Sequence, residues 1–353
     1  MAPFTESGLG EAAPARVGED AERQGRRPKP VYAALDLGTN NCRLLVATPT
    51  AVGFTVIDAF SRIVRLGEGL GSNNRLGEDA IRRTIAALRI CRDKMRARRV
   101  TRSHLIATQA CRMAENGPRF VERVKRELDL ALDIVDQRTE AHLAAAGCAA
   151  LADPLADNLI LFDIGGGSSE IVWLDKAGEG RPVSERIRAW ASLPIGVVTL
   201  AERHGGVSVT DSVFEAMVAE VDRALSQFKI DVAPLARCKN FHLLGTSGTV
   251  TTVAGVFLGL QRYERRRVDG LWMRRSEVDS VMASLRAMSY EDRAANGCIG
   301  RDRADLVLAG CAILEAIRRA FPSERLRVAD RGLREGLLTQ MMAADRVWTE
   351  ATA

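Results

Sequence analysis

The sequence predicts an α/β protein made of two similarly folded halves around a cleft. Three observations lead to this expectation. Short apolar runs typical of buried strands alternate with segments whose apolar residues recur at helical spacing. One pattern, an apolar strand followed by an aspartate, a glycine-rich turn and a second strand, occurs twice. The length of 353 residues suits two domains better than one or three.

The repeat is the most specific of these observations. Its first copy reads VYAALDLGTNN over residues 31–41 and its second reads NLILFDIGGGSS over 158–169, each followed by another apolar strand. Asp36 aligns with Asp163 and Gly38 with Gly165. Chance agreement over so many features is improbable, so we infer an internal duplication with one copy opening each domain.

The elements of the first half follow from local patterns. Ile81, Ile85 and Leu88 recur at helical spacing and predict a helix that continues to Met95. Apolar runs and helical patterns then predict, in order, a strand over 104–108, a helix over 120–128, a strand over 132–135 and an alanine-rich helix over 139–151. This alternation is typical of an α/β domain.

The second half continues in the same way. After the second copy of the repeat we expect a hairpin over 170–175 and 184–190, and a helix over 211–228 capped by Asp211. The remaining predicted elements are a strand over 241–244 leading into GTSGT (245–249), a helix over 303–320, a strand over 326–329, a turn at 330–332 and a last helix over 333–344.

Composition excludes several classes of protein. Apolar residues make up 46% of the chain and charged residues 27%, as in globular proteins. No stretch reaches the roughly 20 apolar residues of a membrane-spanning helix. Seven cysteines without a C-x-x-C pair favour a reducing compartment, so we expect a cytoplasmic location. The net charge of +5 could favour an anionic substrate and is too small to indicate nucleic-acid binding.

The expected domain boundaries follow from the repeat. Residues 1–30 mix acidic and basic side chains without a core-forming pattern, so we expect a disordered arm that activity does not require. Domain I is expected over 31–137, completed by a C-terminal helix at about 338–350. Domain II is expected over 138–337.

Glycine turns that follow an aspartate-terminated strand are suited to binding phosphate. Their backbone N–H groups can surround the anion, glycine permits close approach, and the carboxylate can hold a divalent cation. The alternative is a tight turn in which glycine supplies a positive φ. The pairing of two turns, with GTSGT as a third, favours a phosphate clamp. Neither a P-loop nor a Rossmann fingerprint is present.

The motifs together resemble the exopolyphosphatase and guanosine pentaphosphate phosphohydrolase (Ppx/GppA) family, in its short two-domain form. The segments that carry the resemblance are ALDLGTNN (34–41), ATQACR (107–112), TEA (139–141), FDIGGGSSE (162–170), LPIGVV (193–198), GTSGT (245–249) and DRGLREG (330–336). They run in order over about residues 31–340. The resemblance implies two ribonuclease H-like domains of the actin-like ATPase and sugar kinase superfold around a central cleft.

The resemblance also implies an activity and roles for individual residues. The family hydrolyses the terminal phosphoanhydride of polyphosphate, or the 5′-terminal phosphate of guanosine pentaphosphate, with Mg²⁺ or another divalent cation such as Mn²⁺. Glu140 falls on the general base and Arg112 on a phosphate-contacting arginine, while Asp36, Asp163 and Glu170 are candidate metal ligands. The candidate phosphate-binding residues are Gly38, Thr39, Asn40, Asn41, Gly165, Gly166, Gly167, Ser168, Ser169, Gly245, Thr246, Ser247 and Gly248.

Other interpretations stay open at this point. From spacing alone, Glu140 would be a helix-opening glutamate that favours the helix dipole. The motif around it departs from the family, because Thr139 precedes it and His142 stands where arginine is common. A kinase or ATPase of the same superfold, or a nucleotide-binding regulator without turnover, would share the turns. The resemblance suggests a homodimer.

Six arginines form a dense basic segment of the sequence. It comprises Arg262, Arg265, Arg266, Arg267, Arg274 and Arg275. Such a run is usually a solvated face, but at the mouth of the cleft it would attract a polyanion in a salt-dependent manner.

Overall fold

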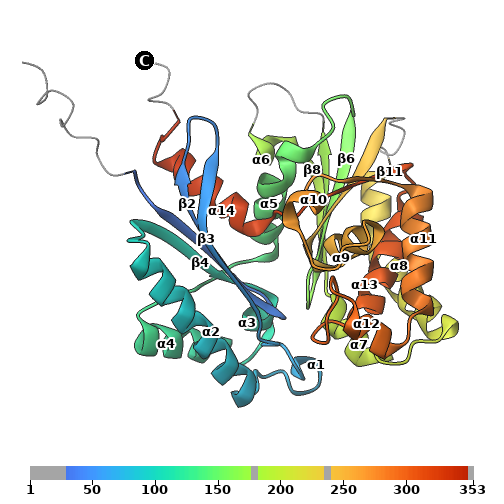
Figure 1. The fold of residues 1–353 in the computed structure, drawn as a ribbon, viewed down its shortest axis with the longest axis horizontal. Helices are drawn as coiled ribbons and strands as arrows, with labels where there is room; N and C mark the ends of the chain where they lie inside the picture. The colour runs from blue at the N-terminus through green and yellow to red at the C-terminus, as the bar shows by residue number, and fades with distance from the viewer. Residues whose placement is uncertain (1–28, 176–181, 234–239, 349–353) are drawn as a thin grey trace, which may run out of the picture.

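A computed structural model describes residues 29–175, 182–233 and 240–348. The predicted arm over residues 1–30 lies almost wholly outside the described residues. The chain forms two mixed β-sheets, each with helices on its faces (Figure 1). This confirms the predicted α/β class.

The first sheet has the strand order β3-β2-β1-β4-β5. Its strands are β1 (Tyr32–Leu37), β2 (Asn41–Pro49), β3 (Phe54–Ile63), β4 (Arg102–Ala107) and β5 (Asp133–Ile134). Helices α2 (Glu78–Ala97) and α4 (Gly117–Leu128) cover one face, where Ile81, Ile85 and Leu88 join the core as the helical spacing predicts. Two short helices, α1 (Leu70–Asn73) and α3 (Gln109–Met113), complete this half.

The second sheet has the order β10-β11-β9-β6-β7-β8. Its strands are β6 (Asn158–Ile164), β7 (Ser169–Asp175), β8 (Ile187–Leu193), β9 (Phe241–Thr246), β10 (Trp272–Arg274) and β11 (Arg325–Val328). The helices packed around it are α7 (Val197–His204), α8 (Asp211–Val232), α9 (Ser247–Phe257), α11 (Arg275–Ala287), α12 (Tyr290–Ala295) and α13 (Val307–Ala320). Two short helices, α6 (Val183–Arg186) and α10 (Arg265–Val268), lie in connections.

The two sheets repeat the same topology, as the duplication in the sequence predicts. β1 is antiparallel to β2 and parallel to β4, and β6 is antiparallel to β7 and parallel to β9. Each sheet extends beyond these strands with an antiparallel edge strand, β3 or β8, and with a further parallel strand, β5 or β11. The duplicated glycine turns therefore occupy equivalent corners, between β1 and β2 and between β6 and β7.

Helices α5 (Gln137–Cys148) and α14 (Leu333–Ala344) lie between the two sheets (Figure 1). They share one apolar core with side chains from both sheets, among them Ala34 and Ile106 of the first and Leu161 and Val172 of the second. At its far end α14 is held to the first sheet, because Tyr32 Oη donates a hydrogen bond of 2.7 Å to Asp345 Oδ2. These two helices thus connect the halves.

Several expected boundaries are corrected. The cap of α8 is Thr210, whose hydroxyl accepts a hydrogen bond from the Val213 N–H, while Asp211 is the first helical residue. The second strand of the predicted hairpin begins at Ile187, because residues 183–186 form α6. The helix expected from residue 303 begins at Val307. Among the helices that the structure describes, none combines the length and apolar character needed to cross a membrane.

Candidate active site

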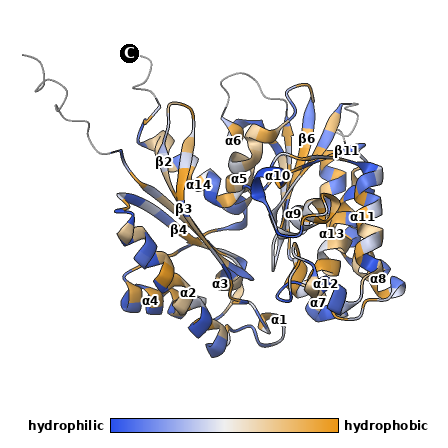
Figure 2. Cartoon of the chain, viewed as in Figure 1, coloured by the Kyte–Doolittle hydropathy of each residue, from blue (hydrophilic) through white to orange (hydrophobic). Residues whose placement is uncertain are grey.

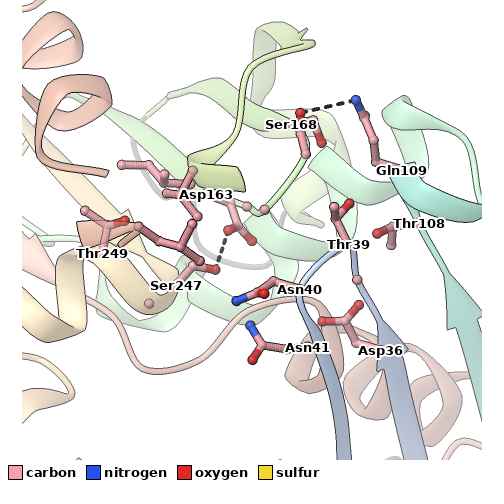
Figure 3. Close-up of a pocket in the computed structure, with 18 of the residues that line it drawn as sticks. Asp36, Thr39, Asn40, Asn41, Thr108, Gln109, Asp163, Ser168, Ser247 and Thr249 are labelled. Carbon is pink, nitrogen blue, oxygen red and sulfur yellow. Dashed lines mark hydrogen bonds between the residues drawn. The ribbon is translucent and has the colours of Figure 1, made fainter. Parts of the chain in front are cut away.

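The three predicted turns meet in one cleft between the two halves (Figure 3). We call residues 38–41 the first turn and 165–168 the second turn, while residues 247–249, predicted as part of a third turn, are the first residues of helix α9. All three line the cleft, together with Asp36, Asp163, Glu140 and Glu170. Residues far apart in the sequence are thus brought together where the repeat predicts that the turns face each other.

Close contact explains the glycines of the second turn. A Cβ atom on Gly166 would lie 3.1 Å from the Asn40 nitrogen, and one on Gly167 would lie 2.7 Å from Thr39 Oγ1. None of the glycines in the first two turns adopts a positive φ. Gly166 and Gly167 are therefore favoured because the two turns touch, and the positive-φ interpretation does not apply to them.

The two turns have the same backbone hydrogen bonding. Gly38 N–H donates to Asn41 O and Gly165 N–H donates to Ser168 O, both at 2.9 Å. In the first turn, the carbonyl of Asn40 accepts from the backbone of residues 64 and 65. In the second turn, the carbonyls of Gly165 and Gly166 accept from the first residues of α7. Because carbonyl and N–H point to opposite sides of a trans peptide, these bonds fix the direction of the turn N–H groups.

Polar side chains of the first turn lack partners within the described chain. Thr39 Oγ1, Asn40 Oδ1 and Asn41 Oδ1 are buried and accept or donate no hydrogen bond. Such atoms cost free energy unless a ligand or water satisfies them. Their position beside the second turn is suited to a hydrated or metal-bound phosphate.

Glu140 lies in the first turn of α5 and is 7% exposed. The helix is capped by Asp136, whose carboxylate accepts a hydrogen bond of 2.7 Å from the Thr139 N–H, so Glu140 is not the capping residue. Its Oε2 instead accepts from Arg112 Nη1 at 3.2 Å. Burial raises the pKa of Glu140 to about 9, the nearby Glu170 adds to the increase, and Arg112 opposes it.

Arg112 is held on both sides of its guanidinium group. Nη1 also donates to Val135 O at 2.7 Å, and Nη2 donates to Gln109 Oε1 at 3.1 Å. Its Nε is buried without a partner. Arg112 therefore contacts Glu140 and keeps two N–H groups, those of Nε and the second of Nη2, without an acceptor among the described residues.

The three predicted metal ligands are buried or partly buried carboxylates. Burial raises the pKa of Asp36 and of Asp163, and raises that of Glu170 to about 7. Asp163 accepts a hydrogen bond from the Ser247 hydroxyl (Figure 3), and Glu170 Oε1 accepts one of 2.8 Å from Ser192. Within the described ranges, no three Asp, Glu, His or Cys side chains converge as a ready metal-ligand set. Mg²⁺ commonly takes only one or two carboxylates with phosphate and water, so Asp36 and Asp163 fit it better than a three-carboxylate set.

The predicted third glycine turn needs correction in part. The segment is a strand-to-helix junction, because Gly245 and Thr246 end β9 and Ser247 begins α9, and neither Gly245 nor Thr246 lines the cleft. A Cβ on Gly245 would lie 2.6 Å from the Phe162 ring, and the Thr246 hydroxyl donates to Arg331 O at 2.6 Å. Ser169, at the start of β7, is likewise absent from the lining, and its hydroxyl donates to Ile195 O at 2.7 Å.

A second pocket adjoins the cleft and is strongly basic. It shares Arg43, Ser247, Gly248 and Arg303 with the cleft. Further arginines line it, namely Arg265, Arg301 and Arg334, as do the rings of Phe60 and Tyr263. Among the arginines of the predicted basic segment, Arg265 faces this pocket and pairs with Glu335 at 2.8 Å. Figure 2 shows α10 as a strongly hydrophilic segment near the gap between the halves.

Sequence reasoning missed several residues of the site. Arg43, Gln109 and Arg303 line the cleft but were not assigned to it. Arg43 lies two residues after the first turn and Gln109 lies within the quoted ATQACR motif, so a signal was present for both. Asp330, the first residue of the predicted turn at 330–332, lines the second pocket and accepts a hydrogen bond of 2.6 Å from Tyr263 Oη.

Comparisons with known proteins agree with this geometry. The family model described as "Ppx/GppA phosphatase family" matches residues 45–345. The chain is 28% identical over 320 residues to the guanosine-5′-triphosphate,3′-diphosphate pyrophosphatase of Photobacterium profundum. That match covers 90% of this chain and 60% of the relative. It is 26% identical over 314 residues to a Haemophilus influenzae protein provisionally named as an exopolyphosphatase, covering 87% of this chain and 90% of that one.

Solved structures give the same result. A crystal structure of an Aquifex aeolicus Ppx/GppA family member superposes with a TM-score of 0.73 at 27% identity, covering 90% of this chain and 99% of that one. An exopolyphosphatase from Cytophaga hutchinsonii gives a TM-score of 0.80 at 22% identity, over 89% of this chain and 98% of that one. The second likeness establishes the fold alone.

Proposed function

This chain belongs to the Ppx/GppA phosphatase family, and from that premise we propose that it is an exopolyphosphatase. It would hydrolyse the terminal phosphoanhydride of inorganic polyphosphate and release orthophosphate. The observation that carries the proposal is the position of Glu140, a buried carboxylate paired with Arg112 in a cleft lined by both glycine turns.

The chemistry assigned to Glu140 is that of a general base. Its carboxylate takes a proton from water, the water oxygen bonds to the terminal phosphorus, and the bridging P–O bond breaks with its electron pair passing to the shortened chain. A carboxyl whose pKa is raised to about 9 is a stronger base once it is ionised, and Arg112 favours the ionised form. Burial thus makes the ionised carboxylate of Glu140 more basic, and it also lowers the fraction of Glu140 that is ionised at neutral pH.

The other residues bind and orient the substrate. The turn N–H groups and the unpartnered Thr39, Asn40 and Asn41 side chains would contact phosphate oxygens. Asp36 and Asp163 would hold Mg²⁺, or Mn²⁺ in its place, which when bound would neutralise part of the phosphate charge. The arginines of the second pocket would contact the remaining phosphates of the chain.

A second candidate is the hydrolysis of guanosine pentaphosphate at its 5′-terminal phosphate. One observation favours it, since two aromatic residues, Phe60 and Tyr263, line the second pocket, where a base could stack. The density of guanidinium groups in the same pocket supports polyphosphate as the leading substrate.

The test compares initial rates of phosphate release from polyphosphate, guanosine pentaphosphate and ATP under saturating Mg²⁺. We expect polyphosphate to give the highest kcat/KM. A preference for guanosine pentaphosphate would select the second candidate, and a preference for ATP would indicate an ATPase or kinase. No release from any of the three, with retained substrate binding, would indicate a regulator without turnover.

A further inference from the structure

Gln109, within the ATQACR motif, occupies a junction between the two halves that the repeat does not explain. It is the first residue of α3, lines the cleft and is 8% exposed. Its amide makes two hydrogen bonds in opposite directions. Oε1 accepts from Arg112 Nη2 at 3.1 Å, and Nε2 donates to Gly167 O at 3.2 Å, a bond between the first and second halves (Figure 3).

The hydrogen bond from Gln109 to Gly167 takes the place of backbone hydrogen bonds that the first turn makes within its own half. By the alignment of Asp36 with Asp163, Gly167 is the counterpart of Asn40. The Asn40 carbonyl accepts backbone bonds of 2.9 and 3.0 Å from Val64 and Arg65, which belong to its own half. The Gly167 carbonyl has no such backbone donor among the described residues. Besides Gln109, only the Thr199 hydroxyl reaches it there, at 3.5 Å.

This difference has a consequence for the second turn. α7 fixes the carbonyls of Gly165 and Gly166 from within the second half. The carbonyl of the next peptide, between Gly167 and Ser168, receives its shorter hydrogen bond from a side chain of the first half, at 3.2 Å against 3.5 Å from Thr199. Because its N–H points opposite to its carbonyl, Gln109 determines where the Ser168 N–H is directed. The turn therefore reaches its full phosphate-binding arrangement only when the halves are together.

The other hydrogen bond of the Gln109 amide is accepted from Arg112. Its guanidinium is oriented by Val135 O and Glu140 on Nη1 and by Gln109 on Nη2, which leaves Nε buried and free. Without Gln109, Nη2 of Arg112 would lose the one acceptor that it has among the described residues, and the plane of the guanidinium group could rotate about the Nη1 contacts. A guanidinium must hold its plane to present paired N–H groups to a phosphate.

We propose that Gln109 is a positioning residue that couples the orientation of Arg112 to that of the second turn across the cleft. It contacts Arg112 and Gly167 rather than the reacting atoms. The inference rests on the proposed phosphatase function. It extends that function by assigning to the Gln109 amide the link between Arg112 of the first half and the second turn of the second half. Misplacement of positioning groups by about 1 Å can cost on the order of 10²-fold in rate.

The experiment compares Gln109→Met with wild type, alone and in an Arg112→Ala background. Methionine has a similar length and removes both bonds. We measure kcat/KM for polyphosphate and the Kd of inorganic triphosphate with Mg²⁺. Gln227→Met is the matched control, because Gln227 lies on the exposed face of α8 and bonds only Asp231 in its own helix.

We expect Gln109→Met to lower kcat/KM by roughly 10- to 100-fold and to leave the unfolding temperature near that of wild type. In the Arg112→Ala background the same change should cost several-fold less than in wild type, because only the bond to Gly167 is then left to lose and coupled residues are not additive. Equal losses in both backgrounds, or a single variant within twofold of wild type, would overturn the inference.

Two outcomes require a second measurement, namely a Gln109→Met variant that does not fold and a wild-type protein that releases no phosphate. If Gln109→Met does not fold, Gln109→Glu replaces it, since glutamate keeps the acceptor for Arg112 and loses the donor to Gly167. It should still lower kcat/KM at least about fivefold, and a smaller effect would contradict the proposal. If wild type releases no phosphate, the proposed function fails, whereas the coupling is then decided by triphosphate binding alone.

Discussion

At the scale of single residues, Glu140 lies where a charged carboxylate is unfavourable. It is buried, it faces Glu170, and one hydrogen bond from Arg112 compensates in part. A group in such a place often has a chemical role rather than a structural one. Two predictions separate its contribution to turnover from its effect on stability.

The first concerns turnover. Glu140→Gln keeps the shape of the side chain and removes the basic carboxylate, so kcat for polyphosphate should fall by roughly 10² to 10⁴. Substrate binding should persist within a few-fold. Phosphate release and calorimetric binding on the same preparation test this. If the variant turns over within a few-fold of wild type, Glu140 is not the base.

The second concerns stability in the absence of metal. The pKa of Glu140 is raised from about 4.5 in the unfolded chain to about 9 in the fold. The contribution of Glu140 to the free energy of unfolding is therefore fully present below pH 4.5 and is lost as the pH rises toward 9. Glu140→Gln removes this loss, so the metal-free variant should melt higher than wild type by roughly 2–5 °C at pH 8 and by less at pH 5. Thermal scans at the two pH values decide it, and an equal difference at both would contradict it.

At the scale of elements, the contact between the two glycine turns is the critical feature. Gly167→Ala would place a Cβ 2.7 Å from Thr39 Oγ1 and 2.9 Å from Gln109 Cγ, so the side chains of Thr39 and Gln109 or the turns themselves must shift. We expect kcat/KM to fall at least about tenfold, by displacement of the phosphate-binding groups. Gly77→Ala is the control, because nothing lies within 4 Å of its added Cβ and its φ is −73°. Similar activity of both variants would show that the turns tolerate separation.

The sequence predicted elements better than it predicted their contacts. Helix α14 matches its predicted range, and the duplicated turns meet as expected. Strand β3 was missed because it lies at the edge of its sheet with many exposed side chains, so its sequence lacks the apolar run of a buried strand. The Gln109 contact to Gly167 was missed for another reason. It joins residues 58 positions apart, and no local pattern encodes such a contact.

At the scale of the whole molecule, further contacts hold the halves together across the cleft. Arg65 Nη2 donates to Asp305 Oδ1 at 3.0 Å and to Asp302 O at 3.1 Å, and the Gly69 N–H donates to Glu202 Oε1 at 3.0 Å. Arg65→Ala should therefore raise KM for polyphosphate by roughly two- to tenfold, as expected for a partly exposed pair, with a smaller effect on kcat. Steady-state kinetics test this against Arg75→Ala, which removes an ion pair within the first half. An unchanged KM would show that these contacts do not contribute to closure.

The core shared by α5, α14 and both sheets makes each half depend on the other for folding. Neither sheet can cover its inner face without helices that also cover the opposite sheet. We therefore expect the described chain to unfold as one cooperative unit, with calorimetric and van't Hoff enthalpies in agreement. A fragment that ends near residue 137 should expose Ala34 and Ile106 and aggregate. The duplication thus produced two copies of a topology that can no longer exist as independent proteins, and two separate melting transitions would contradict this interdependence.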